Sequence, residues 1–145
     1  MAVWNQATLS DITFFDRCDG EYFLPVYIEN ENELAQIETT PLTYMFHVSD
    51  GNHLSLSKYF SDDGDVPYFR GQDINDFFLE NASPIMIPER VFTSTMMTRS
   101  HFYPGDVLLS IVGTIGSLSF VPESFGSATG SCKIAILRSK GSYSP

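Results

Sequence analysis

The amino-acid sequence predicts an α+β fold: a small twisted β-sheet domain with mixed or antiparallel strands and a few short helices, formed by residues 1–145 as a single domain. Apolar runs are short and end at proline, glycine, asparagine or aspartate, as strands do. Aromatic residues are abundant, with 12 Phe and 7 Tyr, and such side chains favour pleated, half-buried surfaces. The one longer helical pattern lies near the N-terminus.

Residues 1–41 are expected to form an acidic, helical segment at the start of this domain. Leu9–Phe15 is a short first element. A helix follows from Pro25, because proline suits the first helical turn, and it runs to about Glu38. Two glutamates four residues apart weaken this helix, so we expect packing or a basic partner surface to hold it. Its apolar stripe consists of Tyr27, Leu34 and Ile37.

Residues 42–138 are expected to form a β-rich core. Pro67 lacks a backbone N–H, which indicates an edge strand or the start of a strand. Asp73 is suited to cap a short turn. Outside the hairpin, the expected strands are residues 42–47, 66–70, 85–87 and 133–137, and the expected helical turns are residues 54–60, 73–78 and 89–97.

A β-hairpin with a glycine-containing tip is the most distinctive element of this core. The turn Pro104–Asp106 is followed by an apolar run to Val112, and a second run, Ser117–Val121, stops at a proline. The tip between these runs is Gly113–Gly116. Two interpretations are open. The glycines supply positive φ angles at a tight turn, or the bare backbone N–H groups and the threonine hydroxyl of the tip hold a phosphate oxygen.

The net charge of −10, from 18 acidic and 8 basic residues, argues against strong binding to a polyanion. The charge is uneven, however, because residues 11–38 hold eight acidic residues against Arg17 alone. From residue 90 onward five basic residues face only two acidic ones, so the C-terminal half can present a locally basic face. If the chain binds a polyanion, we expect weak binding that needs a partner to supply further cations. The five cations are Arg90, Arg99, Lys133, Arg138 and Lys140.

Missing motifs exclude several classes of protein. No apolar stretch is long enough to cross a bilayer, and the N-terminus lacks the pattern of a signal peptide. The sequence has no Pro-Pro pair for methyl transfer, no acidic residue two positions before a lysine, and no Gly-Lys-Ser/Thr for nucleotide binding. Cys18 and Cys132 have no metal or redox spacing. We expect a cytoplasmic protein that is not an enzyme and has no cofactor, metal or small-molecule substrate.

One polar loop contains candidate ligands. His47, Asp50 and His53 fit no well-defined zinc pattern, so a surface loop with incidental histidines is the simpler interpretation. A third interpretation is that Asp50, Asn52 and His53 contact base edges or phosphates. Three carboxylates at helical spacing between residues 73 and 80 indicate a capped, solvated turn or, alternatively, paired acids.

Four segments, in order along the chain, carry a resemblance to a known family. They are Arg17–Pro25, Asp65–Ile74, Pro104–Gly116 and Ala128–Arg138. Together they resemble the target-recognition domain of type I restriction–modification DNA specificity subunits, a module also fused to some DNA methyltransferases. Family members continue into the rest of the recognition domain and a coiled-coil helix. The resemblance therefore implies an incomplete domain, either a fragment of a longer protein or a short natural chain.

The resemblance implies a sequence-specific DNA reader. It would recognise one half of a bipartite target in double-stranded DNA and position it for an adenine-N6 methyltransferase (M) subunit, and for a restriction (R) subunit where present. Phosphate contacts would set the register, and polar side chains would read bases in the major groove. The residues expected to contact DNA are Asp50, Asn52, His53, Tyr68, Arg70, Gln72, Arg99, Ser100, His101, Gly113, Thr114, Gly116, Ser131 and Lys133.

Some of these assignments have alternatives. Arg70 suits a guanine edge but can equally pair with Asp73 to stabilise the fold. Lys133 is a phosphate cation or a solvent-facing strand residue. A second function is also open, in which the chain is a protein–protein docking or decoy module that binds a methyltransferase or specificity subunit. Convergence of Arg70, Arg99 and Lys133 beside the hairpin tip would favour the DNA reader, and scattering would favour docking.

Overall fold

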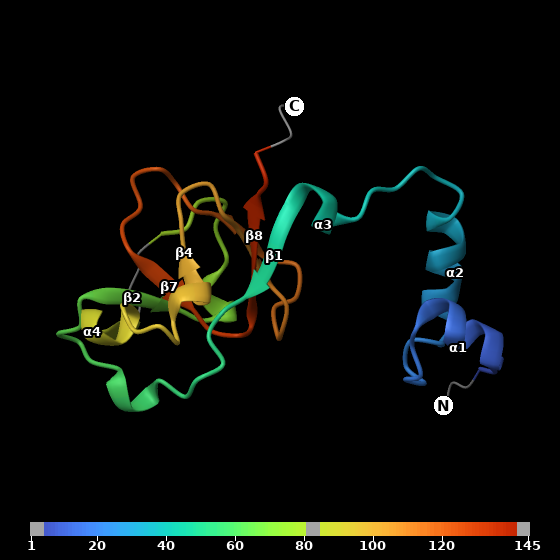
Figure 1. Cartoon of the computed structure of the whole chain (residues 1–145), viewed down its shortest axis with the longest axis horizontal. Coiled ribbons are helices and arrows are strands. Elements are labelled where there is room, and N and C mark those ends of the chain that lie inside the picture. The colour runs from blue at the N-terminus through green and yellow to red at the C-terminus, as the bar shows by residue number, and fades with distance from the viewer. Residues whose placement is uncertain (1–4, 81–84, 142–145) are drawn as a thin grey trace. The chain divides into compact units, whose positions relative to one another are not determined.

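The computed structural model describes residues 5–80 and 85–141, and the chain forms two compact units. The first unit is Met1–Pro41 and the second is Leu42–Pro145. In Figure 1 the helices of the first unit are blue, and the strands of the second run from teal to red. Within the described residues, the two longest helices belong to the first unit and every strand belongs to the second.

The first unit contains the helices α1 (Leu9–Phe15) and α2 (Pro25–Leu34). Thr8 caps α1, because its hydroxyl oxygen accepts a hydrogen bond from the backbone N of Asp11 and the Asp11 carboxylate accepts one from the backbone N of Thr8. Proline occupies the first turn of α2 as predicted, but the helix ends at Leu34 and not near Glu38.

An aromatic cluster forms the interior of this unit. The ring of Phe15 contacts those of Tyr22 and Phe23, with centroids 5.4 and 6.3 Å away, and the latter two rings are 5.2 Å apart. Phe23 is buried, whereas no residue of α1 or α2 is. The predicted apolar stripe of α2 is therefore exposed within its own unit and contributes little to the stability of that helix.

The second unit consists of two four-stranded sheets, which confirms the predicted α+β class and divides the expected single sheet in two. The first sheet is antiparallel with the order β1 (Phe46–Asp50), β8 (Ile134–Ser139), β5 (Val107–Ser110) and β6 (Leu118–Phe120). The second has the order β3 (Ile85–Ile87), β2 (Val66–Phe69), β7 (Ala128–Gly130) and β4 (His101–Phe102), and is mixed because β2 and β7 are parallel. The helices are α3 (Leu42–Met45) and α4 (Glu89–Phe92), with 3-10 turns η1 (Ser57–Tyr59), η2 (Gly71–Asp73) and η3 (Thr98–Ser100).

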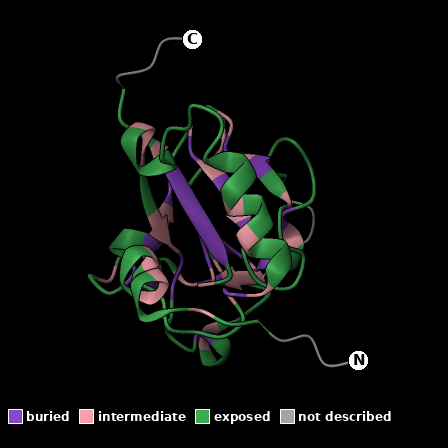
Figure 2. Ribbon diagram, turned by 90° about the vertical axis from the view of Figure 1, so that its right-hand side faces the viewer, coloured by how far each residue is buried: buried purple, intermediate pink, exposed green. Residues whose placement is uncertain are grey.

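Two apolar clusters stabilise this unit, and β2 contributes to both. Phe69 belongs to a cluster with Leu108, Ile134 and Ile136, which joins the two sheets. The neighbouring Tyr68 belongs to a second cluster with residues of η1, β3 and α4. Because successive side chains of a strand point to opposite faces, β2 is buried on both sides. Figure 2 shows burial concentrated in the strands, while the helices are largely exposed.

The position of Pro67 differs from the prediction. β2 is an interior strand and not an edge strand, since β3 pairs with one side and β7 with the other. The paired residues of β7 begin opposite Tyr68, one residue after the proline, so the missing N–H falls outside the parallel ladder.

Several boundaries were also predicted wrongly. Residues 42–45 form α3, and the strand expected at 42–47 begins only at Phe46. The turn expected at 73–78 lies earlier, at Gly71–Asp73. The strands expected at 85–87 and 133–137, the helical turn within 89–97 and the hairpin are present, although the loop between the hairpin strands spans residues 111–117. The short strands β4 and β7 had no counterpart in the prediction.

Candidate nucleic-acid interface

A groove of about 520 Å³ lies where the loop after β1, the end of β2, η2, the hairpin loop and the loop before β8 meet. We call this hollow the hairpin groove. It brings together residues that are far apart in the sequence and were predicted as DNA contacts. These are Asn52, His53, Tyr68, Arg70, Gln72, Gly113, Thr114, Ser131 and Lys133.

Asn52 shapes one wall of the hairpin groove. Its backbone N donates to the carbonyl of Gly130 at 2.7 Å, and its own carbonyl accepts from the backbone N of Cys132 at 3.0 Å. The side-chain amide is occupied by the backbone of Leu54, from which it accepts at 3.0 Å and to which it donates at 3.2 Å. The buried Asn52 therefore holds the loop in place, and its side-chain amide already has partners within the protein.

Arg70 lies on the groove and forms the ion pair with Asp73 that was one of its two predicted roles. Its Nε and Nη2 atoms donate to the two carboxylate oxygens of Asp73, each at 3.0 Å, and its backbone N donates to the same carboxylate at 2.8 Å. This hydrogen bonding raises the pKa of Arg70. A guanidinium group carries five N–H donors, so the pair leaves donors for a DNA contact.

The hairpin loop is fastened to η2 by Thr114. Its hydroxyl donates to the carbonyl of Gly71 at 3.2 Å and lies 3.1 Å from the hydroxyl of Ser110. Gly113 and Gly116 have φ angles of 85° and 92°, a region that favours glycine. The turn-geometry interpretation of both glycines is thus confirmed, and the Thr114 hydroxyl binds the protein backbone.

Tyr68 and Lys133 complete the groove. The Tyr68 side chain is buried on β2, and this burial raises the pKa of its hydroxyl. Lys133 is exposed, and no ion pair within the described part of the chain involves its ammonium group. Lys133 is therefore a cation on the groove with its charge available to an anion.

A second, smaller hollow of about 280 Å³ adjoins the hairpin groove and shares Asn52, His53 and Leu54 with it. Arg99 and Ser100 line this second hollow. Arg99 is paired with Asp50, which also contacts His53. Of the three cations used to discriminate between the functions, Arg70 and Lys133 lie on the groove itself, and Arg99 lies on the adjoining hollow.

Three predicted contacts have mainly structural roles here. Ser100 is buried, and its hydroxyl donates to the carbonyl of Met97 at 2.8 Å. The ring of His101 stacks on Phe92 with centroids 3.8 Å apart, outside both hollows. The backbone N of Gly116 donates to the carbonyl of Ser110 at 3.0 Å and lies outside the groove lining.

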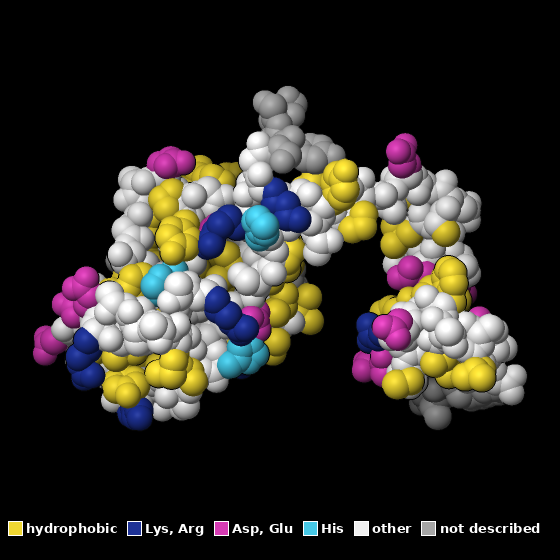
Figure 3. All heavy atoms as spheres, in the orientation of Figure 1, with side chains coloured by type: hydrophobic (Ala, Val, Ile, Leu, Met, Phe, Trp, Pro, Cys, Tyr) yellow, Lys and Arg dark blue, Asp and Glu magenta, His cyan; other side chains and the backbone are white. Residues whose placement is uncertain are grey.

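Two of the five C-terminal cations, Arg138 and Lys140, make contacts within the fold. Arg138 is committed to the fold, because its Nε and Nη2 donate to the buried carboxylate of Asp106 at 2.8 and 2.7 Å. Lys140 donates to the carbonyl of Thr43 at 2.7 Å. The locally basic face is thus narrower than the count of charges predicted. Figure 3 shows Lys and Arg side chains as separate groups on the face in view, with Asp and Glu among them.

Sequence inspection missed part of the groove. Leu54, Ser55, Val112 and Cys132 also line it. None has a residue type that signals binding, and they lie here because their loops meet in space. Gly71 lines the groove as well, and it lies so close to the hairpin that an added Cβ would be 3.0 Å from the Ser110 hydroxyl oxygen.

Three further points about the described residues concern a membrane-spanning helix, a metal site and disulfides. No helix within residues 5–80 and 85–141 is long and apolar enough to span a bilayer. In the same ranges no three His, Cys, Asp or Glu side chains gather as a metal site would require. Cys18 is exposed and Cys132 half-buried, and both are free thiols.

The fold has counterparts among solved structures. One is the HsdS subunit from Thermoanaerobacter tengcongensis, which matches 74% of this chain with a TM-score of 0.52 and 21% sequence identity. The resemblance predicted from the sequence is confirmed at the level of the fold. A second is a structure of the type I restriction–modification system, concerned with complex assembly and conformational transition, which matches 80% of this chain with a TM-score of 0.51 and 20% identity.

The match covers only a part of each solved chain. This chain covers 26% of the first structure's chain and 30% of the second's, so it spans less than a third of either. No protein-family model and no curated protein sequence matches the chain.

Proposed function

We propose that this chain is the sequence-specific DNA-recognition module of a restriction–modification system and is not itself an enzyme. It reads one half of a bipartite target and positions the DNA for an adenine-N6 methyltransferase subunit in the cytoplasm, with a restriction subunit where one is present. One observation carries the proposal. Two of the three expected DNA-contacting cations, Arg70 and Lys133, line the same groove as the hairpin tip, in a fold shared with an HsdS subunit.

The charge of the chain sets how such a module would bind. Within the described residues four arginines are paired with aspartates, namely Arg17, Arg70, Arg99 and Arg138. Few cations are thus left for phosphates, and the net charge of −10 repels DNA at long range. The module is therefore expected to obtain much of its affinity from the basic surface of a partner.

Binding to duplex DNA should increase strongly when a methyltransferase subunit is added and should fall steeply with salt. Each phosphate neutralised contributes about −0.9 to the slope of log K against log salt concentration. Fluorescence anisotropy of a labelled duplex over a salt series, with the chain alone and with the subunit, measures both effects. Absence of DNA binding in both states would contradict the proposal.

Replacing Lys133 with alanine should weaken DNA binding of the assembled complex several-fold and make the salt slope shallower by about one, because one phosphate contact is lost. The exposed position of Lys133 predicts an unchanged unfolding transition. Arg70→Ala should weaken binding similarly. Lys58→Ala is the matched control, since Lys58 lies over the ring of Tyr59 and outside the groove lining. Equal DNA binding by the wild type and both groove variants would count against the hairpin groove as the DNA-binding surface.

A docking module is the second candidate, and the first unit favours it. Leu9, Phe14 and Val26 are 79%, 82% and 61% exposed in a segment with eight acidic residues and one arginine between residues 11 and 38. Exposed apolar side chains among acidic ones suit a partner surface that is apolar and basic. Tight binding to the methyltransferase subunit without any DNA binding would identify this function.

A further inference from the structure

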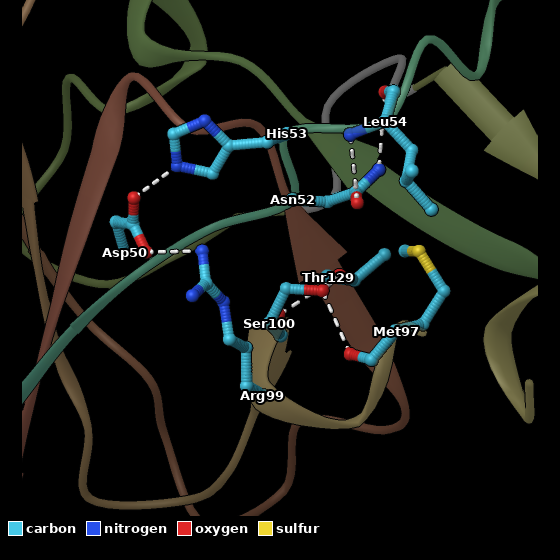
Figure 4. Close-up of polar contacts among 8 residues, drawn as sticks. All are labelled: Asp50, Asn52, His53, Leu54, Met97, Arg99, Ser100 and Thr129. Atoms are coloured by element: carbon cyan, nitrogen blue, oxygen red, sulfur yellow. Dashed lines mark hydrogen bonds and ion pairs between the residues drawn. The ribbon is translucent and has the colours of Figure 1, made fainter. Parts of the chain in front are cut away.

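A three-residue polar cluster of Asp50, His53 and Arg99 lies at the rim between the hairpin groove and the adjoining hollow. His53 lines both hollows and Arg99 lines the second, while Asp50 lines neither and contacts both of these residues. Asp50, the last residue of β1, has its two carboxylate oxygens engaged by different partners (Figure 4). Nη2 of Arg99 donates to Oδ1 at 2.7 Å, and Nε2 of His53 is hydrogen-bonded to Oδ2. The cluster joins residues 49 positions apart in the sequence.

Buried structure fixes the backbones that carry this cluster. Asp50 is paired with Ala135 of β8. Arg99 belongs to the η3 turn, whose last residue is anchored because the Thr129 hydroxyl donates to the carbonyl of Ser100 at 2.8 Å. Both Ser100 and Thr129 are buried. The backbone segments that carry the carboxylate and the guanidinium are thus held by the fold and do not require a ligand.

The charged ends of the cluster are nevertheless accessible. The side chains of Arg99 and His53 are 63% and 60% exposed, whereas that of Asp50 is 34% exposed. Exposed ion pairs of this kind are weak, so a competing anion can take their donors. A phosphate oxygen accepts from guanidinium and imidazole N–H groups in the same way as a carboxylate oxygen.

The electrostatics of the cluster oppose an approaching phosphate. The hydrogen bond from His53, assisted by the charge of Arg99, holds the pKa of Asp50 below its ordinary value, although partial burial acts against it. Asp50 is therefore ionised at neutral pH and neutralises the cation that a phosphate would seek. Arg70 and Lys133 line the groove next to it, so a DNA backbone tracking that groove would pass this rim.

We propose that Asp50 is a built-in counter-ion that a DNA phosphate must displace from Arg99 and His53. This inference rests on the proposed function and deepens it. Non-specific DNA, which gains little from base contacts, does not offset the loss of the Asp50 contacts, while a cognate target does. Asp50 thereby lowers non-specific affinity.

The substitution Asp50→Asn tests the inference, because it removes the charge with almost no change in shape. In the complex with a methyltransferase subunit, the variant should bind a duplex of random sequence several-fold more tightly than wild type, with a salt slope steeper by about one. The double variant Asp50→Asn/Arg99→Gln should lose this gain. Asp19→Asn is the matched control, since Asp19 pairs with Arg17 at the same N–O distance of 2.7 Å in the other unit and changes the net charge equally.

Two results would overturn the inference while leaving the proposed function intact. In the first, the wild-type complex binds DNA and the Asp50→Asn variant binds it equally well or more weakly. In the second, Asp19→Asn gives the same gain in affinity for random DNA as Asp50→Asn. A second measurement does not need DNA. Titration with inorganic phosphate at constant ionic strength, followed by the ring signals of His53, should give a saturable shift in Asp50→Asn that is much weaker in wild type. Absence of DNA binding by the wild-type complex would refute the proposed function, and equal phosphate titrations would refute the counter-ion.

Discussion

Replacing Gly51 with alanine is expected to lower the free energy of unfolding of the second unit by about 3 kcal/mol, the upper end of the usual cost of over-packing. A Cβ atom at this position would lie 2.2 Å from the carbonyl oxygen of Ser131 and 2.5 Å from that of Gly130. Both obstacles are backbone atoms. The chain at Gly51 cannot move away from residues 130 and 131 without loss of two backbone hydrogen bonds. They run from the Gly51 N to the carbonyl of Ile134 at 3.0 Å and from the Asn52 N to the carbonyl of Gly130 at 2.7 Å.

Chemical denaturation followed by fluorescence measures this loss. Gly126→Ala is the control within the same unit, because no heavy atom lies within 4 Å of a Cβ added there. Equal stability of the two variants would show that the approach of the β1 and β7 ends is looser than the structure indicates. The Gly51 substitution should also disturb the groove, since Asn52 and Ser131 line it.

The second large effect is expected at Arg138. The Asp106 side chain is only 1% exposed and accepts three hydrogen bonds, two from Arg138 and one of 2.8 Å from the backbone N of Tyr103. Arg138→Ala leaves this carboxylate buried without its cation. Breaking a buried pair from one side costs about 3–5 kcal/mol. Because the Arg138 side chain is itself 39% exposed, we expect the lower end, about 3 kcal/mol.

An exposed arginine–aspartate pair provides the comparison. Arg99 and Asp50 are also 2.7 Å apart, but both side chains are more exposed, so Arg99→Ala should change the free energy of unfolding by less than about 1 kcal/mol. Arg138→Lys should recover only part of the loss, since lysine cannot donate in a two-pronged arrangement. Similar unfolding midpoints for Arg138→Ala and Arg99→Ala would contradict the argument from burial.

Much of the fold was predictable because local signals were strong. The proline at the start of α2, the Pro-Gly-Asp turn and the two glycines of the hairpin each have a conformational reason that acts over a few residues. Short apolar runs identified β2, β3 and β8, with boundaries within one or two residues. These features depend on the chain only over the length of one element.

The remainder depends on pairings between distant segments. β4 and β7 consist of two and three residues, too few to show periodicity, and they form strands because β2 and β4 flank β7. Pro67 is tolerated in an interior strand only because the register with β7 begins one residue later. No local pattern encodes that register.

The candidate site shows the same division. Residue type suggested which side chains could contact an anion, and three of them, Arg70, Lys133 and Thr114, line one groove. The ion-pair partners of the arginines could not be predicted, because Asp50 contacts Arg99, and Asp106 contacts Arg138, only after the strands have paired. Whether a cation is available to DNA is therefore a property of the fold and not of the count of charges.

The position of β8 has a consequence for biosynthesis. This strand is the last element of the described chain, yet it lies between β1 and β5 and is the only strand paired with β1 in the described sheets. During translation β1 emerges early and has no neighbour to pair with until β8 has left the ribosome. The first sheet therefore closes late, after most of the second unit has been made, and the edges of β1 and β5 stay open to chaperones or to aggregation during that interval.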